Sequence, residues 1–318
     1  MKKDFLSILD FSAKEVLSTL ELAEKLKLEL KAKGENEKIL SGKSLVMLFE
    51  KPSLRTRLSF EVGMTQLGGH AIYFSQADMG MGNREDVSDI AQVASSMCDL
   101  LLARTFKHET IENIAQNASN PVINALTDLE HPCQILADLL TILEVKGRLK
   151  GLKIAFLGDG ENNVTHSLAL ACSLLGINFH VASPKGYQMK AEIIKLAKIL
   201  SFKNGSEIVE TNNPSEAVED ADVVYTDTWV SMGDEAEKEK RLKIFHKYQV
   251  TKQIMKLAKQ DAIFMHDMPV YRGKEVTSEV IDGVQSVILQ QAENRLHAQK
   301  ALIIYLLSGS SGAGFEAK

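Results

Sequence analysis

The chain has 318 residues, enough for one large domain or two ordinary ones. Its 45% hydrophobic and 25% charged residues are typical of a globular protein, and a net charge of −5 argues against an overall basic surface for nucleic acid. The longest apolar runs are too short to cross a membrane, and we expect no signal peptide. Three widely spaced cysteines match no zinc or redox pattern and predict a protein of the reducing cytoplasm.

Helical patterns alternate with short strands along the chain. Ser12 and Glu15 form a capping box, and apolar residues recur at helical spacing after it, which predicts a first helix. Residues 131–151 predict a helix that joins two halves of the chain, and residues 284–307 predict a last long helix. Apolar or β-branched runs predict strands at residues 44–49, 71–74, 100–103, 121–125, 153–158, 179–183, 222–227 and 262–267.

This alternation predicts an α/β fold with two domains, each a parallel sheet flanked by helices. Ligands of such sheets bind beyond the carboxyl ends of the strands, and polar clusters follow six of the predicted strands. Three clusters come from each half of the chain, which predicts an active site in an interdomain cleft. The clusters are residues 53–57, Arg104 and His131 in the first half, and residues 162–163, 227–233 and 266–272 in the second.

Residues 53–57, with the sequence SLRTR, open a helix after Pro52. The free N–H groups of a helix start, together with hydroxyl and guanidinium donors, suit a phosphate. An ordinary helix cap with two surface arginines is equally consistent with this motif alone. Arg55 and Arg57 point to different sides of the helix, so we expect Arg57 to brace the site rather than to bind the anion.

Two glycine-containing stretches resemble nucleotide-binding loops, and both fail the pattern. Residues 41–44 precede a strand, and Glu37 stands where a P-loop requires its first glycine. In residues 158–163, Asn163 replaces the last glycine of a dinucleotide fingerprint. We therefore expect a plain strand-to-helix turn there, and a dehydrogenase is the weakest candidate function.

The remaining clusters each allow a structural and a functional interpretation. His131 and Gln134 share one face at a helix start, where a neutral imidazole either caps the helix or donates to a carbonyl oxygen. Asp227 suits a ligand ammonium or serves a capping loop. Arg295 lies on the last helix, at the surface or behind the anion site.

Together these clusters resemble the ornithine carbamoyltransferase family. The resemblance covers nearly the whole chain through six ordered motifs, at residues 49–57, 103–108, 131–138, 227–233, 266–277 and 291–302. It implies transfer of the carbamoyl group of carbamoyl phosphate to the δ-amine of L-ornithine, which gives L-citrulline and phosphate in arginine biosynthesis or catabolism. It also implies a homotrimer or a multiple of trimers, with no metal, cofactor, nucleic acid or membrane partner.

The same resemblance implies a division of labour between the domains. Residues 1–132 would bind carbamoyl phosphate, completed by a C-terminal helix at about 288–307, residues 133–287 would bind ornithine, and residues 308–318 would form a flexible tail. Arg55, Arg104, His131 and Asp267 would be catalytic. Carbamoyl phosphate would contact Ser53, Leu54, Arg55, Thr56, Arg104, His131, Gln134, Asp267, Met268 and Arg295, and ornithine would contact Asn163, Asp227, Ser231 and Met232.

Three positions depart from the family pattern. Asp267 stands where the family usually has cysteine in His-Cys-Leu-Pro, and a carboxylate there would attract a diamine and raise the pKa of the amine unless it accepts the proton. Leu54 replaces a frequent threonine. Gly80 replaces a glutamine or histidine that reaches a neighbouring subunit in relatives. These departures leave two alternatives, a carbamoyltransferase for another amine and a catalytically silent paralogue that binds carbamoyl phosphate.

Overall fold

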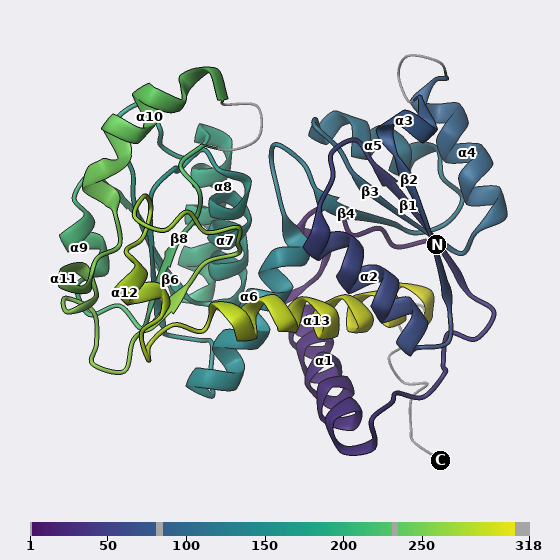
Figure 1. Cartoon of the computed structure of the whole chain (residues 1–318), viewed down its shortest axis with the longest axis horizontal. Coiled ribbons are helices and arrows are strands. Elements are labelled where there is room, and N and C mark those ends of the chain that lie inside the picture. The colour runs from purple at the N-terminus through teal and green to yellow at the C-terminus, as the bar shows by residue number, and fades with distance from the viewer. Residues whose placement is uncertain (1, 81–84, 231–234, 309–318) are drawn as a thin grey trace. The chain divides into compact units, whose positions relative to one another are not determined.

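The computed structural model describes residues 2–80, 85–230 and 235–308, and it divides the chain into two compact units (Figure 1). The first unit comprises the chain up to Leu140 together with the residues from Glu293 onward, and the second comprises Thr141–Ala292. The division falls within two helices, α6 (Pro132–Lys146) and α13 (Ile288–Ser308). The predicted flexible tail lies outside the described residues from position 309 onward.

A four-stranded parallel sheet forms the centre of the first unit. Its order is β2-β1-β3-β4, with β1 at Ser44–Phe49, β2 at His70–Ser75, β3 at Leu100–Arg104 and β4 at Val122–Leu126. The two central strands are apolar and buried, whereas β2 lies at the edge and exposes alternate residues. The helices of this unit are α1 (Ala13–Lys33), α2 (Leu54–Gln66), α3 (Gln76–Met79), α4 (Val87–Met97) and α5 (His108–Asn117), with a short 3-10 turn at Ile8–Asp10.

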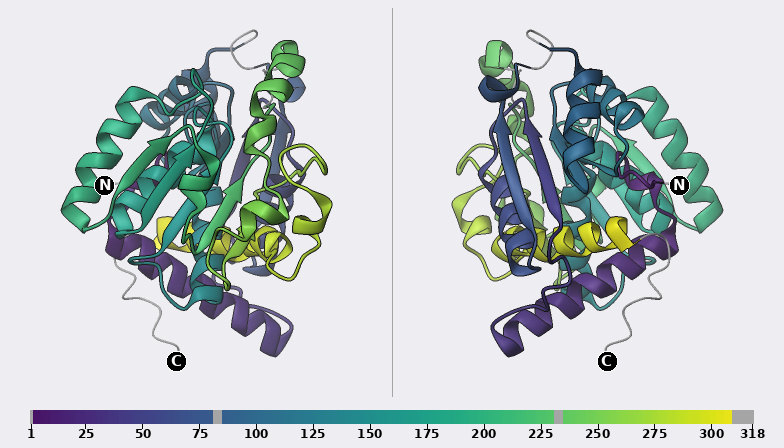
Figure 2. Two further views of the ribbon diagram at one scale, coloured as in Figure 1. Left: turned by 90° about the vertical axis from the view of Figure 1, so that its left-hand side faces the viewer. Right: turned by 90° about the vertical axis from the view of Figure 1, so that its right-hand side faces the viewer.

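The last helix completes the first unit by packing along the first helix (Figure 2). Tyr305 of α13 donates a hydrogen bond to Glu15 at 2.7 Å, and its ring lies 4.7 Å from that of Phe11. Lys27 of α1 donates to Asn294 of α13 at 2.7 Å. The predicted capping box at the start of α1 is confirmed, because Ser12 and Glu15 bond each other's backbone N–H.

A five-stranded parallel sheet forms the centre of the second unit. Its order is β7-β6-β5-β8-β9, so the chain starts in the middle with β5, moves to one edge and returns to the other side. The strands are β5 (Lys153–Leu157), β6 (Asn178–Ala182), β7 (Ile208–Thr211), β8 (Val223–Thr226) and β9 (Ile263–Met265). The helices are α7 (Asn163–Leu175), α8 (Ala191–Asn204), α9 (Pro214–Val218), α10 (Lys238–Phe245), α11 (Lys252–Met255) and α12 (Ser278–Ile281), with 3-10 turns at Glu235–Glu237 and His246–Tyr248.

These two parallel sheets with flanking helices confirm the predicted fold class. Two details differ from the prediction. Strand β7 was not expected, because its four residues mix apolar and polar types at a sheet edge. Helix α13 begins at Ile288 rather than at 284, because the preceding residues bond β9: Phe264 N–H donates to Gln285 and Val287 N–H donates to Phe264. Among the described residues, no helix is long and apolar enough to span a membrane.

Candidate active site

The motif at residues 53–57 opens α2 beyond the carboxyl end of β1. Ser53 caps this helix and accepts a hydrogen bond from Thr56 N–H at 3.3 Å. Leu54 is 75% exposed, and Arg55 is half-buried. Arg57 turns elsewhere: its Nε donates to Glu61 at 2.9 Å, and its guanidinium lies 4.0 Å from the ring centroid of Tyr73. Glu61 and Tyr73 therefore hold Arg57. Arg55 is the arginine at the start of α2 that is left to contact a ligand.

Arg295 connects three separate helices of the first unit. It is almost fully buried on α13, and it donates to Gln134 Oε1 of α6 at 2.7 Å and to Thr56 Oγ1 of α2 at 2.9 Å. Gln134 in turn donates to Asp138 at 2.8 Å, which fixes its amide oxygen toward Arg295. Arg104 lies buried at the end of β3. The structure thus brings together four residues that are distant in sequence: Thr56, Arg104, Gln134 and Arg295.

His131 lies directly before α6 and is buried at 2% exposure. Burial, followed by the positive charges of Arg295, Arg104, Lys51 and Arg55, lowers the pKa of His131 well below its usual 6.5. The imidazole is therefore neutral at physiological pH. A neutral ring can donate one hydrogen bond to a carbonyl oxygen without adding a further charge.

Lys51 also belongs to this group, although the sequence motifs did not identify it as a site residue. It is only 7% exposed, and burial together with Arg104 lowers its pKa to about 8. Its position inside the first motif, directly before Pro52, was the available signal. Lys51, Arg55, Arg104 and Arg295 thus surround a neutral His131. Such a concentration of positive charge at a helix start suits a phosphorylated ligand.

In the second unit, Asp227 lies at the carboxyl end of β8 and is buried. Its carboxylate accepts hydrogen bonds from Asn162 Nδ2 and from Thr228 N–H, both at 2.6 Å. Asn162 also caps α7 by accepting from Val164 N–H at 2.6 Å, and Asn163 is the first residue of that helix. The side chain that holds Asp227 is therefore Asn162, and Asn163 lies beside it, half-buried.

A second carboxyl group faces Asp227 from the loop after β9. Burial, followed by the charge of Asp267, raises the pKa of Asp227 well above its usual 3.8. Asp267 Oδ1 lies 3.5 Å from His266 Nδ1, and His266 Nε2 lies 3.3 Å from Glu275 Oε1. One oxygen of each aspartate and one ring nitrogen of His266 all lie within 4.8 Å of one another. Like charges at this distance disfavour ionisation of both aspartates at once.

Both ring nitrogens of His266 contact neighbouring groups of the second unit. Nδ1 accepts a hydrogen bond from Met268 N–H at 2.9 Å while Nε2 faces Glu275, so both ring nitrogens are engaged within the protein. Met268 has a left-handed backbone with φ of 60°, which the bond to His266 helps to hold.

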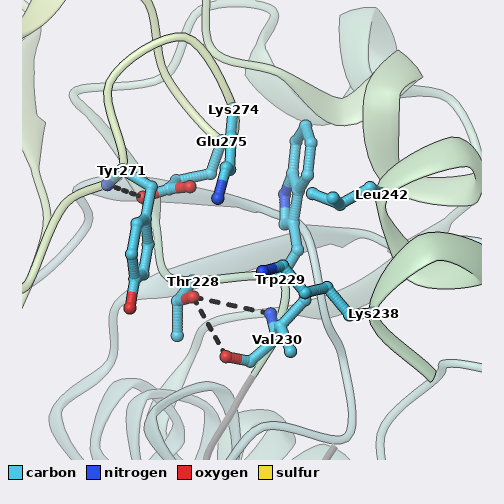
Figure 3. Close-up of a pocket in the computed structure, with 8 residues that line it drawn as sticks. All are labelled: Thr228, Trp229, Val230, Lys238, Leu242, Tyr271, Lys274 and Glu275. Carbon is cyan, nitrogen blue, oxygen red and sulfur yellow. Dashed lines mark hydrogen bonds between the residues drawn. The ribbon is translucent and has the colours of Figure 1, made fainter. Parts of the chain in front are cut away.

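A cavity of about 180 Å³ adjoins the cluster within the second unit (Figure 3). Glu275, which bonds His266, forms part of its wall, and Tyr271 N–H donates to Glu275 at 2.5 Å. Trp229 and Leu242 supply an apolar side opposite Tyr271 (Figure 3). Of the other predicted ligand-binding residues, Ser231 and Met232 lie outside the described residues. Gly80 ends α3 with a left-handed backbone.

Two family models match the chain over nearly its whole length. The model described as "Aspartate/ornithine carbamoyltransferase, carbamoyl-P binding domain" matches residues 3–144, and "Aspartate/ornithine carbamoyltransferase, Asp/Orn binding domain" matches residues 150–306. The chain belongs to the aspartate/ornithine carbamoyltransferase family. The first matched region contains Lys51, Arg55 and Arg104 of the cationic group, and the second contains Arg295 and the carboxyl cluster.

Ornithine carbamoyltransferases of bacteria and archaea are among the proteins similar to this chain. An ornithine carbamoyltransferase of Anoxybacillus flavithermus is 54% identical over 305 residues, 96% of either chain. One of Bacillus subtilis is 49% identical and is matched over 96% of this chain and 94% of its own. The solved structure of the ornithine carbamoyltransferase from Pyrococcus furiosus superposes with a TM-score of 0.94 at 47% identity, covering 97% of this chain and 98% of that one.

Proposed function

We propose that this family member transfers the carbamoyl group of carbamoyl phosphate to the δ-amine of L-ornithine, giving L-citrulline and phosphate. The observation that carries the proposal is the identity of 54% and 49%, over nearly the full chain, to proteins named ornithine carbamoyltransferase. The two polar groups described above have the chemistry that this reaction needs. Their predicted meeting in an interdomain cleft stays a prediction.

In this proposal the first unit binds carbamoyl phosphate. The start of α2, with Ser53, Leu54, Arg55 and Thr56, holds the phosphate together with Arg104 and Arg295. The positive charges stabilise the leaving dianion. Neutral His131 donates to the carbamoyl oxygen, where negative charge develops, and Gln134 binds the carbamoyl NH2 group. The hydrogen bonds from Arg295 to Thr56 and Gln134 support this arrangement by fixing both side chains in advance.

The second unit binds ornithine in this proposal. Asp227 accepts the α-ammonium, while Asn163 and the backbone of Ser231 and Met232 hold the α-carboxylate. The backbone carbonyls of Asp267 and Met268 face the carbamoyl NH2. The short hydrogen bond from Asn162 supports the role of Asp227, because it fixes the carboxylate that would meet the substrate.

Asp267 supplies the step for which the family commonly uses cysteine. The δ-ammonium of ornithine loses a proton to the Asp267 carboxylate, and the neutral amine then attacks the carbamoyl carbon. The bond from that carbon to the bridging oxygen breaks, phosphate leaves with the electron pair, and the second amine proton passes to phosphate. The carboxyl pair supports this role because the two neighbouring aspartates raise the affinity of the site for a proton.

A panel of amines tests the substrate. Ornithine, acetylornithine, putrescine and lysine are each supplied with carbamoyl phosphate, and the ureido product and phosphate are measured. We expect citrulline from ornithine at a rate well above that from the others. If another amine is converted and ornithine is not, that amine replaces ornithine as the proposed substrate. Binding of carbamoyl phosphate without turnover of any amine would indicate a silent paralogue.

We further propose a homotrimer, or a multiple of trimers, that acts in the cytoplasm in arginine biosynthesis or catabolism. The exposed face of edge strand β2 supports assembly, because Ile72 and Phe74 are 39% and 37% exposed there. Leu58 on neighbouring α2 is 56% exposed. Three free cysteines support a reducing compartment.

A further inference from the structure

His108 stands where the chain that leaves Arg104 meets the chain that approaches His131. It is the first residue of α5, four positions after Arg104. Its Nδ1 forms a hydrogen bond of 2.9 Å with Oγ1 of Thr127, a fully buried residue just after β4. Its backbone N–H donates to the Asp128 carboxylate, also at 2.9 Å. The side chain and the backbone of His108 therefore both bond the turn that leads to His131.

Thr127 organises that turn, at residues 127–130, through its backbone and its hydroxyl group. Its N–H donates to the carbonyl of Glu130 at 2.9 Å, which closes the turn. Its Oγ1 accepts the N–H groups of Leu129 and Glu130, both at 3.2 Å. His131 follows directly and precedes α6. The conformation of this turn therefore sets where the imidazole of His131 lies.

The hydrogen-bonding capacity of the Thr127 hydroxyl fixes the direction of its bond with His108. A hydroxyl has two lone pairs and one proton, and the two N–H groups take both lone pairs. The proton can go to His108 Nδ1 at 2.9 Å or to the Glu130 carbonyl at 3.4 Å, and the shorter contact is the stronger. His108 Nδ1 is therefore the acceptor, and the neutral ring carries its proton on Nε2. Without His108 the hydroxyl loses its short acceptor, and its orientation toward the turn is held less firmly.

The same region joins the ends of β3 and β4 beyond their regular pairing. Thr105 N–H donates to the Leu126 carbonyl at 3.0 Å, and Asp128 N–H donates to the Phe106 carbonyl at 3.1 Å. These bonds continue past Arg104, the last residue of β3, and reach the turn at its second residue. A shift of the turn would therefore displace the end of β3 as well.

We propose that His108 is a positioning residue for the reaction, which acts through Thr127 to hold His131 and Arg104 where they contact carbamoyl phosphate. This inference rests on the proposed function for the roles of those two residues. It adds a role within the motif at residues 103–108, for which the family resemblance implies a role of Arg104 alone.

Two substitutions of His108 separate positioning from folding. His108→Asn keeps an acceptor close to the place of Nδ1, whereas His108→Leu keeps the bulk and removes the acceptor. We expect kcat of His108→Leu to fall roughly 10–100-fold, because small displacements of a group at the reacting carbonyl are costly. KM for carbamoyl phosphate should rise, and KM for ornithine should stay normal because its proposed ligands lie in the second unit. His108→Asn should keep most of the activity.

Nuclear magnetic resonance of the histidine ring nitrogens tests the inference without any substrate. In the unmodified chain the neutral ring of His108 should carry its proton on Nε2. The ring signals of His131 should shift in His108→Leu and return toward their native positions in His108→Asn. If no citrulline forms from ornithine, these signals still decide the role of His108, so the failure of the proposed function and the failure of this inference are distinguishable.

Glu109→Leu is the matched control, because Glu109 is exposed and belongs to the same first turn of α5. It removes a favourable charge at the helix start, yet kcat, both KM values and the His131 signals should equal those of the unmodified chain. Thr127→Val removes the hydroxyl, and adding His108→Leu to it should lower kcat little further, because the two residues act as one unit. Normal kcat in His108→Leu, unshifted His131 signals in that variant, or an equal loss in Glu109→Leu would overturn the inference.

Discussion

At the scale of single residues, Asp267 places a second carboxyl group beside Asp227. A buried Asp227, bonded by Asn162, and a half-buried Asp267 beside His266 stand where the family pattern predicts one carboxylate and one thiol. In the proposed function this pair attracts an ammonium group and accepts its proton. The charge of Asp267 is also one of the causes that raise the pKa of Asp227.

Asp267→Asn should therefore have two separable effects. The rate constant kcat with ornithine should fall roughly 10²–10⁴-fold, because the proton acceptor is lost. The pKa of Asp227 should move down toward its usual value, because the neighbouring negative charge is gone. Consequently the acid limb of kcat/KM for ornithine should shift to lower pH. The measurement is a pH–rate profile for the unmodified chain and the variant.

The matched variant is Asp267→Cys, which restores a group that can accept a proton. It should keep far more activity than Asp267→Asn, with its own pH profile set by the thiol. If Asp267→Asn retains normal kcat and an unshifted acid limb, Asp267 does not take part in proton transfer.

His131 gives a second prediction at the residue scale. Because burial and four nearby cations lower its pKa well below 6.5, its ring should stay neutral at pH 6.5 and above. Nuclear magnetic resonance of the ring nitrogens should show one protonated and one bare nitrogen over this range. His131→Asn should lower kcat roughly 10²–10³-fold, because a preset donor to the developing oxyanion is misplaced. A ring that titrates near pH 6.5 would contradict the neutral-donor role.

At the scale of elements, local sequence patterns located most strands because their apolar runs are continuous, as in β1 and β3. They also located the polar clusters, because parallel strands end at one edge of a sheet. Local patterns failed where a contact joins distant segments. The bond between Asn162 and Asp227 spans 65 residues, and that between Arg295 and Thr56 spans 239. No local periodicity encodes such pairs, so the sequence pattern left Arg295 either at the surface or behind the anion site.

Gly160 lies in the loop from β5 to α7, where it packs closely against neighbouring backbone. Gly160 lies against the loop of Tyr187, whose carbonyl accepts its N–H at 2.9 Å, and a methyl group there would sit 2.6 Å from that oxygen. Its absent side chain therefore serves close backbone packing rather than nucleotide binding. The same loop leads into Asn162, so its position sets that of Asp227.

Gly160→Ala should shift this loop and cost about 1–3 kcal/mol of stability, because neighbouring backbone must give way. It should also raise KM for ornithine more than KM for carbamoyl phosphate, since the displaced Asn162 belongs to the second unit. Thermal unfolding and steady-state kinetics measure the two effects. Gly186→Ala is the control: open space surrounds it, so only its left-handed backbone, with φ of 86°, is penalised, and both KM values should stay normal. Equal KM values in Gly160→Ala and the unmodified chain would show that Asn162 is not held by this loop.

At the scale of the whole molecule, the apolar surface of the first unit predicts assembly. Ile72 and Phe74 project from one face of edge strand β2, and an exposed edge strand with large apolar side chains is a surface that a monomer rarely leaves open. Closed symmetric assemblies of identical chains are the usual way of covering such a face. The second unit also exposes an apolar residue, Phe202 on α8, which is 89% exposed but stands on a helix rather than on a sheet edge.

We therefore expect assembly to depend on the exposed apolar residues of β2 and not on Phe202 of α8. Light scattering after gel filtration should give a mass of roughly three times the 35.1 kDa of one chain, or a multiple of that. The double substitution Ile72→Asp with Phe74→Asp should produce single chains, because burying two carboxylates in an apolar interface is unfavourable. Phe202→Asp alters an apolar residue that is more exposed than either of these and should leave the mass unchanged. A double variant that keeps the native mass would place the interface elsewhere on the molecule, and a loss of assembly in Phe202→Asp would move it to α8.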